Sequence, residues 1–279
     1  MKRIIHWEDI IMKNTELYKL LEIPNEVVNR LNQYQSERNI CVPDSLVGRI
    51  LVRSEWDAAV KELQGLVGDD PDGIKILWEL LNIVCRYSHS EYVKMGISMD
   101  VFVDTMKYVT RFLNEHYDTY GCYRFVWAWW FPREISLSEY RIGALEYELV
   151  DGYEREIAVH IPSDADFSPE SVDSSLESFH RFRDTYYPDW KDVKFTCDSW
   201  LMVPELKELL GEGSNIIAFQ NRFVIDSIDR EATWFLGWVY PGAGEDYEAL
   251  PEKTTLQRNM KRYLLSGRKF GVAKGHIKI

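Results

Sequence analysis

The stretch "EREIAVHIPSDADFSPESVDSSLESFHRF" (residues 154–182) joins a predicted strand to a predicted helix through a polar loop. Its first part alternates between polar and apolar residues and is rich in β-branched residues, which is typical of a strand. Because Pro162 has no N–H to donate to a neighbouring strand, we expect this strand to end near His160. Ser168 and Pro169 then form a helix start, and apolar residues recur at helical spacing up to Pro188. The free N–H groups of such a helix start suit a phosphate, although any plain strand–helix connection offers the same geometry.

The flanking sequence predicts more strands. "RIGALEYELV" (141–150), the turn Asp151–Gly152 and "YEREIAVHI" (153–161) have the pattern of a β-hairpin. Further strands are predicted in "VKFTCDSWLM" (193–202), "NIIAFQNRFVIDS" (215–227) and "TWFLGWVY" (233–240), with a short helix in "VPELKELLG" (203–211). The strand ending at His160, the helix after it and the strand ending near Ser199 form a β–α–β crossover, which makes the two strands parallel. This crossover brings four residues into one neighbourhood: His160, Ser163, Ser199 and Trp200.

The chain before Gly121 reads as a series of amphipathic helices, the last of which begins after the capping residue Ser98. The sequence therefore predicts a helical N-terminal domain over residues 1–120 and a second domain over residues 121–279. The second domain is expected to be mixed α/β, with a mostly antiparallel sheet and one parallel strand pair. The fold class of the whole chain is accordingly α+β.

Composition and charge narrow the class of function. The net charge is −12, and residues 252–279 hold eight Lys or Arg against one acid, so the rest of the chain is strongly acidic. An acidic body argues against nonspecific nucleic-acid binding, while the basic end could form an anion site or simply balance the acids. No apolar run approaches a membrane span and no signal peptide is evident, so we expect a cytoplasmic protein that does not bind membranes. The histidines and cysteines show no metal-ligand spacing, and no metal is predicted.

The order of elements in the second domain is that of the GNAT acyltransferase fold. The runs "WWFPREISLSEYRIGALEYEL" (129–149), "HIPSDADFSPESVDSSLESF" (160–179), "CDSWLMVPELKELLGEGSNIIAF" (197–219) and "LPEKTTLQRNMKRYLLSG" (250–267) closely resemble a bacterial acyltransferase-like family. Members of that family pair a helical N-terminal domain with a GNAT-like C-terminal domain. The resemblance covers nearly the whole chain and is dense from about residue 98.

The resemblance implies a site for acetyl-CoA or another acyl-CoA as co-substrate. The pantetheine arm would enter between the two parallel strands, and the loop and helix N-terminus at 163–171 would face the pyrophosphate. The implied cofactor-binding residues are Ile161, Ser163, Asp164, Ala165, Ser168 and Trp200. If the basic end folds back towards this loop, Arg268 or Lys269 would meet a CoA phosphate.

Direct transfer to an amine needs a base, and four residues are candidates for the catalytic site. His160 suits proton abstraction at neutral pH, or else it hydrogen-bonds a loop carbonyl and only shapes the turn. Glu146 and Glu148 share one face of a strand and could supply the base instead, or form its solvated face. Ser199 could protonate the leaving thiolate or bind the acyl oxygen, and capping the next turn is its other role.

Two functions follow from different classes. The first is an acyl-CoA-dependent N-acyltransferase that transfers directly to an unknown amine acceptor in a ternary complex. The second is a catalytically inactive GNAT-like module that binds a small molecule or a protein, and two departures favour it. The Gly-rich signature Q/R-x-x-G-x-G/A is missing, and Asp164 and Asp166 would compete with a phosphate for the N–H groups of the helix. The oligomeric state has no signal in the sequence.

Overall fold

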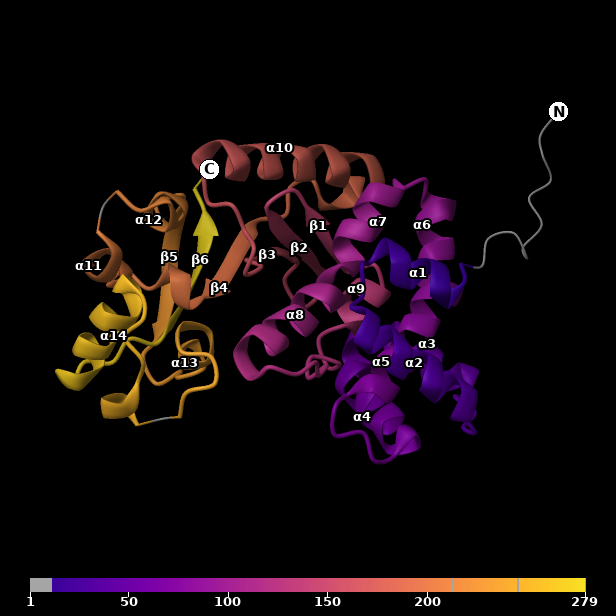
Figure 1. Ribbon diagram of the computed structural model, residues 1–279. Coiled ribbons are helices and arrows are strands. Elements are labelled where there is room, and N and C mark those ends of the chain that lie inside the picture. Colours follow the sequence, from indigo (N-terminus) through magenta and orange to yellow (C-terminus); the bar gives the residue numbers. More distant parts are fainter. Residues whose placement is uncertain (1–11, 212, 245, 279) are drawn as a thin grey trace. The chain divides into compact units, whose positions relative to one another are not determined.

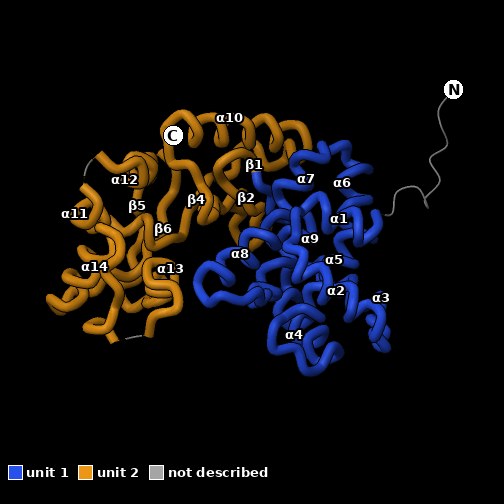
Figure 2. Tube along the Cα trace, viewed as in Figure 1, with its two compact units in different colours: residues 1–141 blue, residues 142–279 orange. Residues whose placement is uncertain are grey.

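The computed structural model describes residues 12–211, 213–244 and 246–278. The chain divides into two compact units, residues 1–141 and 142–279 (Figure 2). The division lies C-terminal to the predicted boundary between residues 120 and 121, and the assignment of the domains stays a prediction. The fold class is confirmed, because a helical region is followed by a mixed α/β region with one parallel strand pair. No helix in the described residues has the length and apolar character needed to cross a membrane.

Unit 1 is built from helices, as its amphipathic periodicity predicts. They are α1 (Asn14–Leu20), α2 (Asn25–Glu37), α3 (Asp44–Ile50), α4 (Trp56–Val67), α5 (Ile74–Ile83), α6 (His89–Met95), α7 (Met99–Met106), α8 (Tyr108–Tyr120) and α9 (Pro132–Ile135). Ser98 caps α7 as predicted, because its side chain accepts from the backbone N–H of Val101. The helix expected from there to Gly121 is interrupted at Lys107 and continues as α8. Gly121 ends α8 in the left-handed conformation, which costs glycine little.

A six-stranded sheet organises the second half of the chain (Figure 1). Its strands are β1 (Glu139–Ile142), β2 (Leu145–Val150), β3 (Glu156–His160), β4 (Phe195–Ser199), β5 (Phe223–Asp229) and β6 (Val272–Ile277), in the order β1-β2-β3-β4-β6-β5. The hairpin β2–β3 and the parallel pair β3–β4 confirm the predicted pattern. The C-terminal strand β6 lies between β4 and β5 and runs antiparallel to both.

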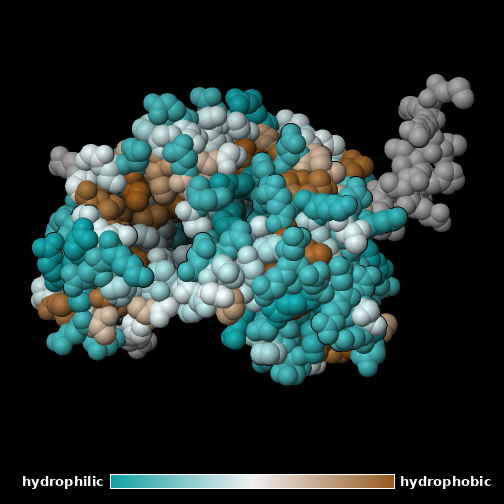
Figure 3. Space-filling model, in the orientation of Figure 1, coloured by the Kyte–Doolittle hydropathy of each residue, from teal (hydrophilic) through white to brown (hydrophobic). Residues whose placement is uncertain are grey.

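One face of the sheet is covered by α10 (Pro169–Tyr186), the helix predicted after Ser168. The Phe179 ring stacks on Tyr147 of β2 with centroids 4.0 Å apart and meets Phe195 of β4 edge-on. The outer side of α10 is hydrophilic (Figure 3). Because side chains alternate along a strand, the pairing register puts a different set on the opposite side of the sheet. We call this side the polar face, and its charged or titratable residues include Glu146 and Glu148 on β2, Glu156 and His160 on β3, Asp198 on β4 and Lys274 on β6.

Three predicted strands differ in the structure. "TWFLGWVY" forms the helix α13 (Phe235–Val239), and the first half of "NIIAFQNRFVIDS" forms α12 (Asn215–Gln220) before β5 begins. "RIGALEYELV" is broken at Gly143, whose φ of 66° turns the chain between β1 and β2. The short helix α11 (Leu206–Leu210) forms as predicted, and α14 (Thr255–Leu265) precedes β6.

Candidate active site

His160 is the last residue of β3 and lies on the polar face. The register of the β2–β3 hairpin pairs it with Glu146, and Glu148 lies two residues further along β2 on the same face. The side chains of Glu146 and Glu148 are buried, so their interpretation as a solvated strand face is wrong. Burying a carboxylate costs free energy unless it is hydrogen-bonded or paired. Glu148 meets that requirement through the imidazole of His160.

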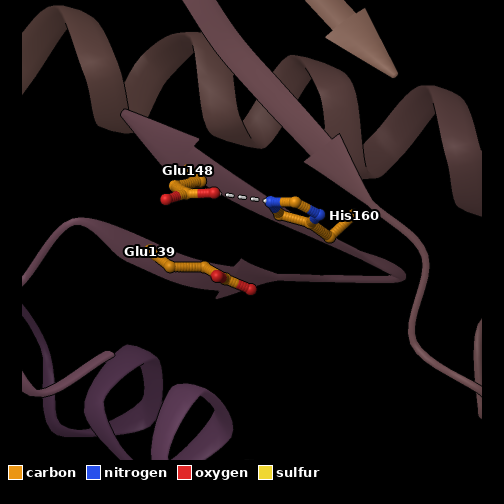
Figure 4. Close-up of side chains that lie close together, drawn as sticks. All are labelled: Glu139, Glu148 and His160. Carbon is orange, nitrogen blue, oxygen red and sulfur yellow. Dashed lines mark hydrogen bonds and ion pairs between the residues drawn. The ribbon is translucent and has the colours of Figure 1, made fainter. Parts of the chain in front are cut away.

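The ring of His160 is held by Glu148 (Figure 4). Nε2 of His160 lies 2.8 Å from Oε2 of Glu148, whose side chain is 5% exposed, while the His160 side chain is 25% exposed. With Glu148 ionised, its carboxylate only accepts, and this assigns the proton of the hydrogen bond to Nε2 and the lone pair to Nδ1. The pair therefore has the arrangement of a base and the residue that fixes its tautomer. Hairpin length and alternation together could have identified Glu148 as this partner.

Glu139 brings a third ligand group to the same edge of the sheet. One oxygen of Glu139, one of Glu148 and a ring nitrogen of His160 all lie within 4.8 Å of one another, and the three residues come from neighbouring strands (Figure 4). An indole hydrogen bond from Trp130 also reaches the carboxylate of Glu139, at 3.2 Å. One imidazole and two carboxylates can bind a divalent transition metal in principle. The absence of a metal predicted from the sequence stays a prediction.

The parallel strands β3 and β4 pair only over part of their length. Ile157 pairs with Phe195 and Ala158 with Thr196, whereas β3 continues to His160 and β4 to Ser199. Both strands thus extend beyond their common register towards their C-terminal ends. This is the place where the family resemblance implies that the pantetheine arm enters.

Ser199 and Trp200 stand at the end of β4, as predicted. The hydroxyl oxygen of Ser199 accepts from the backbone N–H of Leu201 at 3.2 Å and so caps the short turn Trp200–Met202. The capping role that the sequence left open for Ser199 is therefore present. The same hydroxyl retains its proton to donate, so a role in catalysis stays a prediction.

The loop after β3 places Asp166 against the start of α10. Its carboxylate accepts from both the N–H and the hydroxyl of Ser168, each at 2.8 Å, and these hydrogen bonds hold the pKa of Asp166 below its usual range. The expected competition for the helix N–H groups is thus visible at Ser168. Ser163 and Asp164 are exposed, and Ala165 closes a turn by donating to the carbonyl of Pro162. The roles of Ile161 and of this loop in cofactor binding stay predictions.

The basic C-terminal segment is paired with acids. Arg268 forms an ion pair with Glu208 at 2.8 Å, and Lys269 forms one with Glu231 at 2.6 Å. The basic residue at the first turn of α10 is instead Arg222, which contacts Asp173 and donates to the carbonyl of Pro169 at 3.4 Å. Sequence reasoning missed Arg222 because it lay inside a predicted strand.

Comparisons with known proteins identify a domain family in each half of the chain. The model of the N-acyltransferase N-terminal domain matches residues 12–137, and that of the GNAT-like C-terminal domain matches residues 139–277. No curated protein matches the chain.

Solved structures with a similar fold are acyltransferases. One is described as an acyltransferase in complex with decanoyl-CoA and teicoplanin; it is 20% identical, with a TM-score of 0.63 over 96% of this chain and 99% of that chain. A second, in complex with decanoyl-CoA, is 18% identical with a TM-score of 0.63, covering 96% of this chain and 100% of that one. At these identities the likeness establishes the fold.

Proposed function

The chain belongs to the N-acyltransferases that have a GNAT-like C-terminal domain, and from this we propose that it transfers the acyl group of an acyl-CoA directly to an amine. His160 is the general base in this proposal, and Glu148 positions it. The observation that carries the proposal is the 2.8 Å hydrogen bond between these two residues at the end of the parallel strand pair. Similar structures with bound decanoyl-CoA support an acyl-CoA as the donor.

The reaction follows from the positions of these groups. The amine nitrogen attacks the thioester carbonyl, a C–N bond forms, and the proton that the nitrogen loses goes to Nδ1 of His160. Glu148 stabilises the resulting imidazolium through the hydrogen bond to Nε2. The C–S bond breaks as the tetrahedral intermediate collapses, and CoA leaves as a thiolate that takes up a proton. Ser199, at the end of β4, is our candidate for donating it.

Transfer without a covalent enzyme intermediate is supported by the state of Cys197. Its thiol is buried in β4, and burial raises the pKa of Cys197 far above the usual range, with Asp198 adding to the effect. The nucleophile in cysteine chemistry is the thiolate, which this environment disfavours. Attack by the amine on the bound acyl-CoA is the simpler course.

The acyl-CoA enters between β3 and β4 in this proposal. The two strands continue past Ala158 and Thr196, where their pairing ends, and this geometry supports a slot for the pantetheine arm. The pyrophosphate lies towards the first turn of α10. There Arg222 can exchange its contacts with Asp173 and Pro169 for a phosphate oxygen, which compensates for the acids of the loop.

Acyl-CoA binding is the first test. Calorimetric titration with acetyl-, octanoyl- and decanoyl-CoA should give saturable binding, and the melting temperature should rise with ligand concentration. A ligand at a hundred times its Kd stabilises the folded state by about 2.7 kcal/mol. ATP, which lacks the pantetheine arm, serves as the control. If none of the acyl-CoAs binds at millimolar concentration, the proposal is wrong.

A further inference from the structure

Asp198 stands beside His160 on the polar face and takes no part in the chemistry described so far. In the parallel register Ala158 pairs with Thr196, and His160 and Asp198 each lie two residues further along their strands. Both side chains therefore point to the same side of the sheet, just beyond the end of the pairing. The carboxylate of Asp198 makes no hydrogen bond or ion pair with any residue in the described part of the chain.

The cation expected to pair with Asp198 is engaged elsewhere. Lys274 of β6 is the direct cross-strand partner of Asp198, and opposite charges at such positions usually attract each other. The ammonium group of Lys274 instead contacts both carboxylate oxygens of Glu156 on β3, at 2.8 and 3.0 Å. The ion pair thus crosses β4 and leaves the acid on β4 without a direct cation.

The electrostatic surroundings of Asp198 favour an added positive charge. Asp198 is exposed to solvent on one side, and the partial burial of its carboxylate raises its pKa. The charges of Glu156 and Asp229 act in the same direction, while Lys274 and His160 oppose them. A cation brought to this carboxylate would stabilise its ionised form. His160 is near enough to be among the charges that act on Asp198, so one bound group can be influenced by both residues.

We propose that Asp198 binds the acceptor as an ammonium ion, so that the acceptor is a primary alkylamine, protonated at neutral pH, and not an arylamine or an alcohol. This inference rests on the proposed acyl transfer and names the substrate class of the same site. Asp198 holds the ammonium group next to His160, which removes one proton. His160 releases this proton to solvent, the neutral nitrogen attacks the thioester, its second proton goes to Nδ1 of His160, and CoA leaves as described above.

The test compares three nucleophiles of similar size: benzylamine, aniline and benzyl alcohol. Transfer from octanoyl-CoA is followed by the release of the CoA thiol and by mass spectrometry of the product. The wild-type protein should use benzylamine at neutral pH and should use aniline and benzyl alcohol at least about tenfold less well. Asp198→Asn should raise the KM for benzylamine about tenfold or more, the usual size of a charge-assisted contact, with little change in the KM for aniline.

Two further variants separate charge from structure. Asp198→Glu keeps the charge and should retain much of the affinity for benzylamine. Asp192→Asn removes an exposed charge near the other end of β4 and should behave as wild type. An unchanged benzylamine KM in Asp198→Asn, or a preference for aniline or benzyl alcohol, would overturn the inference, and so would a protein that binds octanoyl-CoA but transfers to none of the three. The affinity for octanoyl-CoA is measured separately for the wild-type protein and for each variant. If the wild-type protein does not bind octanoyl-CoA, the proposed function itself is wrong.

Discussion

Glu146 and Glu148 lie two residues apart on β2, are both buried, and face the same side of the sheet. Glu148 accepts a hydrogen bond from His160, while Glu146 is the cross-strand partner of the same histidine. The chemistry distinguishes the two carboxylates. A carboxylate hydrogen-bonded to Nε2 fixes the tautomer and stabilises the imidazolium that forms during proton transfer.

Replacing Glu148 should therefore affect turnover more than binding. Glu148→Gln preserves the size of the side chain and removes its charge, and we expect kcat to fall at least about tenfold while the Kd for acyl-CoA stays within twofold. Glu146→Gln is the matched control from the same strand face. Steady-state kinetics and calorimetry on both variants check the expectation. If Glu146→Gln loses more kcat than Glu148→Gln, then Glu146 is the base or the partner of His160.

The sequence supports the choice of His160 better than the choice of its partners. The strand end at His160 follows from alternation and from Pro162, and the turn at Asp151–Gly152 sets the hairpin that brings Glu148 to it. Asp198 had no comparable signal. Its environment depends on Lys274, which belongs to a strand that sequence periodicity did not reveal.

At the scale of elements, α10 is joined to the β1–β2 turn by the hydroxyl of Ser175. Its O–H group donates to the carbonyl of Ile142, its oxygen accepts from the N–H of Leu145 at 3.3 Å, and it lies 2.9 Å from the hydroxyl oxygen of Tyr147. Ser175 is almost fully buried. The turn favours glycine at position 143, because a residue with a Cβ is strained at its φ of 66°, and a Cβ there would also lie 3.3 Å from the Cα and Cβ atoms of Ser175.

Ser175→Ala should destabilise the fold. The substitution leaves buried polar partners without their hydrogen bonds, and we expect a loss of about 2–4 kcal/mol in the free energy of unfolding. Urea denaturation followed by circular dichroism measures the loss. Ser174→Ala, on the exposed side of the same helix, is the control and should change the midpoint little. Equal midpoints for the two variants would show that the Ser175 hydroxyl contributes nothing.

Helices and strands were predictable where the sequence shows both a residue pattern that marks their end and a clear hydrophobic periodicity. The helix α10 has Ser168 and Pro169 at its start, and the β2–β3 hairpin has a turn dipeptide. In α13 a short apolar run carries both aromatic and β-branched residues, and periodicity alone cannot assign it to a helix or a strand. Ser214 caps α12 and was the boundary signal that sequence reasoning missed. Two glycines, Gly271 and Gly275, obscured β6, because glycine weakens a strand pattern.

Across the whole molecule, much of the positive charge of the C-terminal segment is paired with acidic residues. Four basic residues of the C-terminal segment form ion pairs with acids: Lys261 with Glu252, Arg268 with Glu208, Lys269 with Glu231 and Lys274 with Glu156. This supports the alternative in which the basic end balances the acidic body. The exposed pairs contribute little to stability, because water and salt screen them.

The division of the chain is also a whole-molecule property. The sequence pattern changes at Gly121, where the long amphipathic helices end. The two compact units, however, divide between Arg141 and Ile142. Residues 121–141 contain the short helix α9 and the start of β1, and they belong to unit 1 by their contacts. Such contacts join residues far apart in the sequence and leave no local signal. A domain boundary predicted from the local sequence pattern therefore falls at the end of the last long helix.

The rate of octanoyl transfer to benzylamine by His160→Gln shows whether His160 is the general base. We expect kcat to fall about a hundredfold or more, with the octanoyl-CoA affinity nearly unchanged. A base must be deprotonated to act, so the wild-type rate should fall as the pH is lowered, and the variant should keep only the fall that comes from protonation of benzylamine itself. A rate within a few-fold of wild type, together with a lower melting temperature, would mean that His160 is not the base and has only a structural role in the turn.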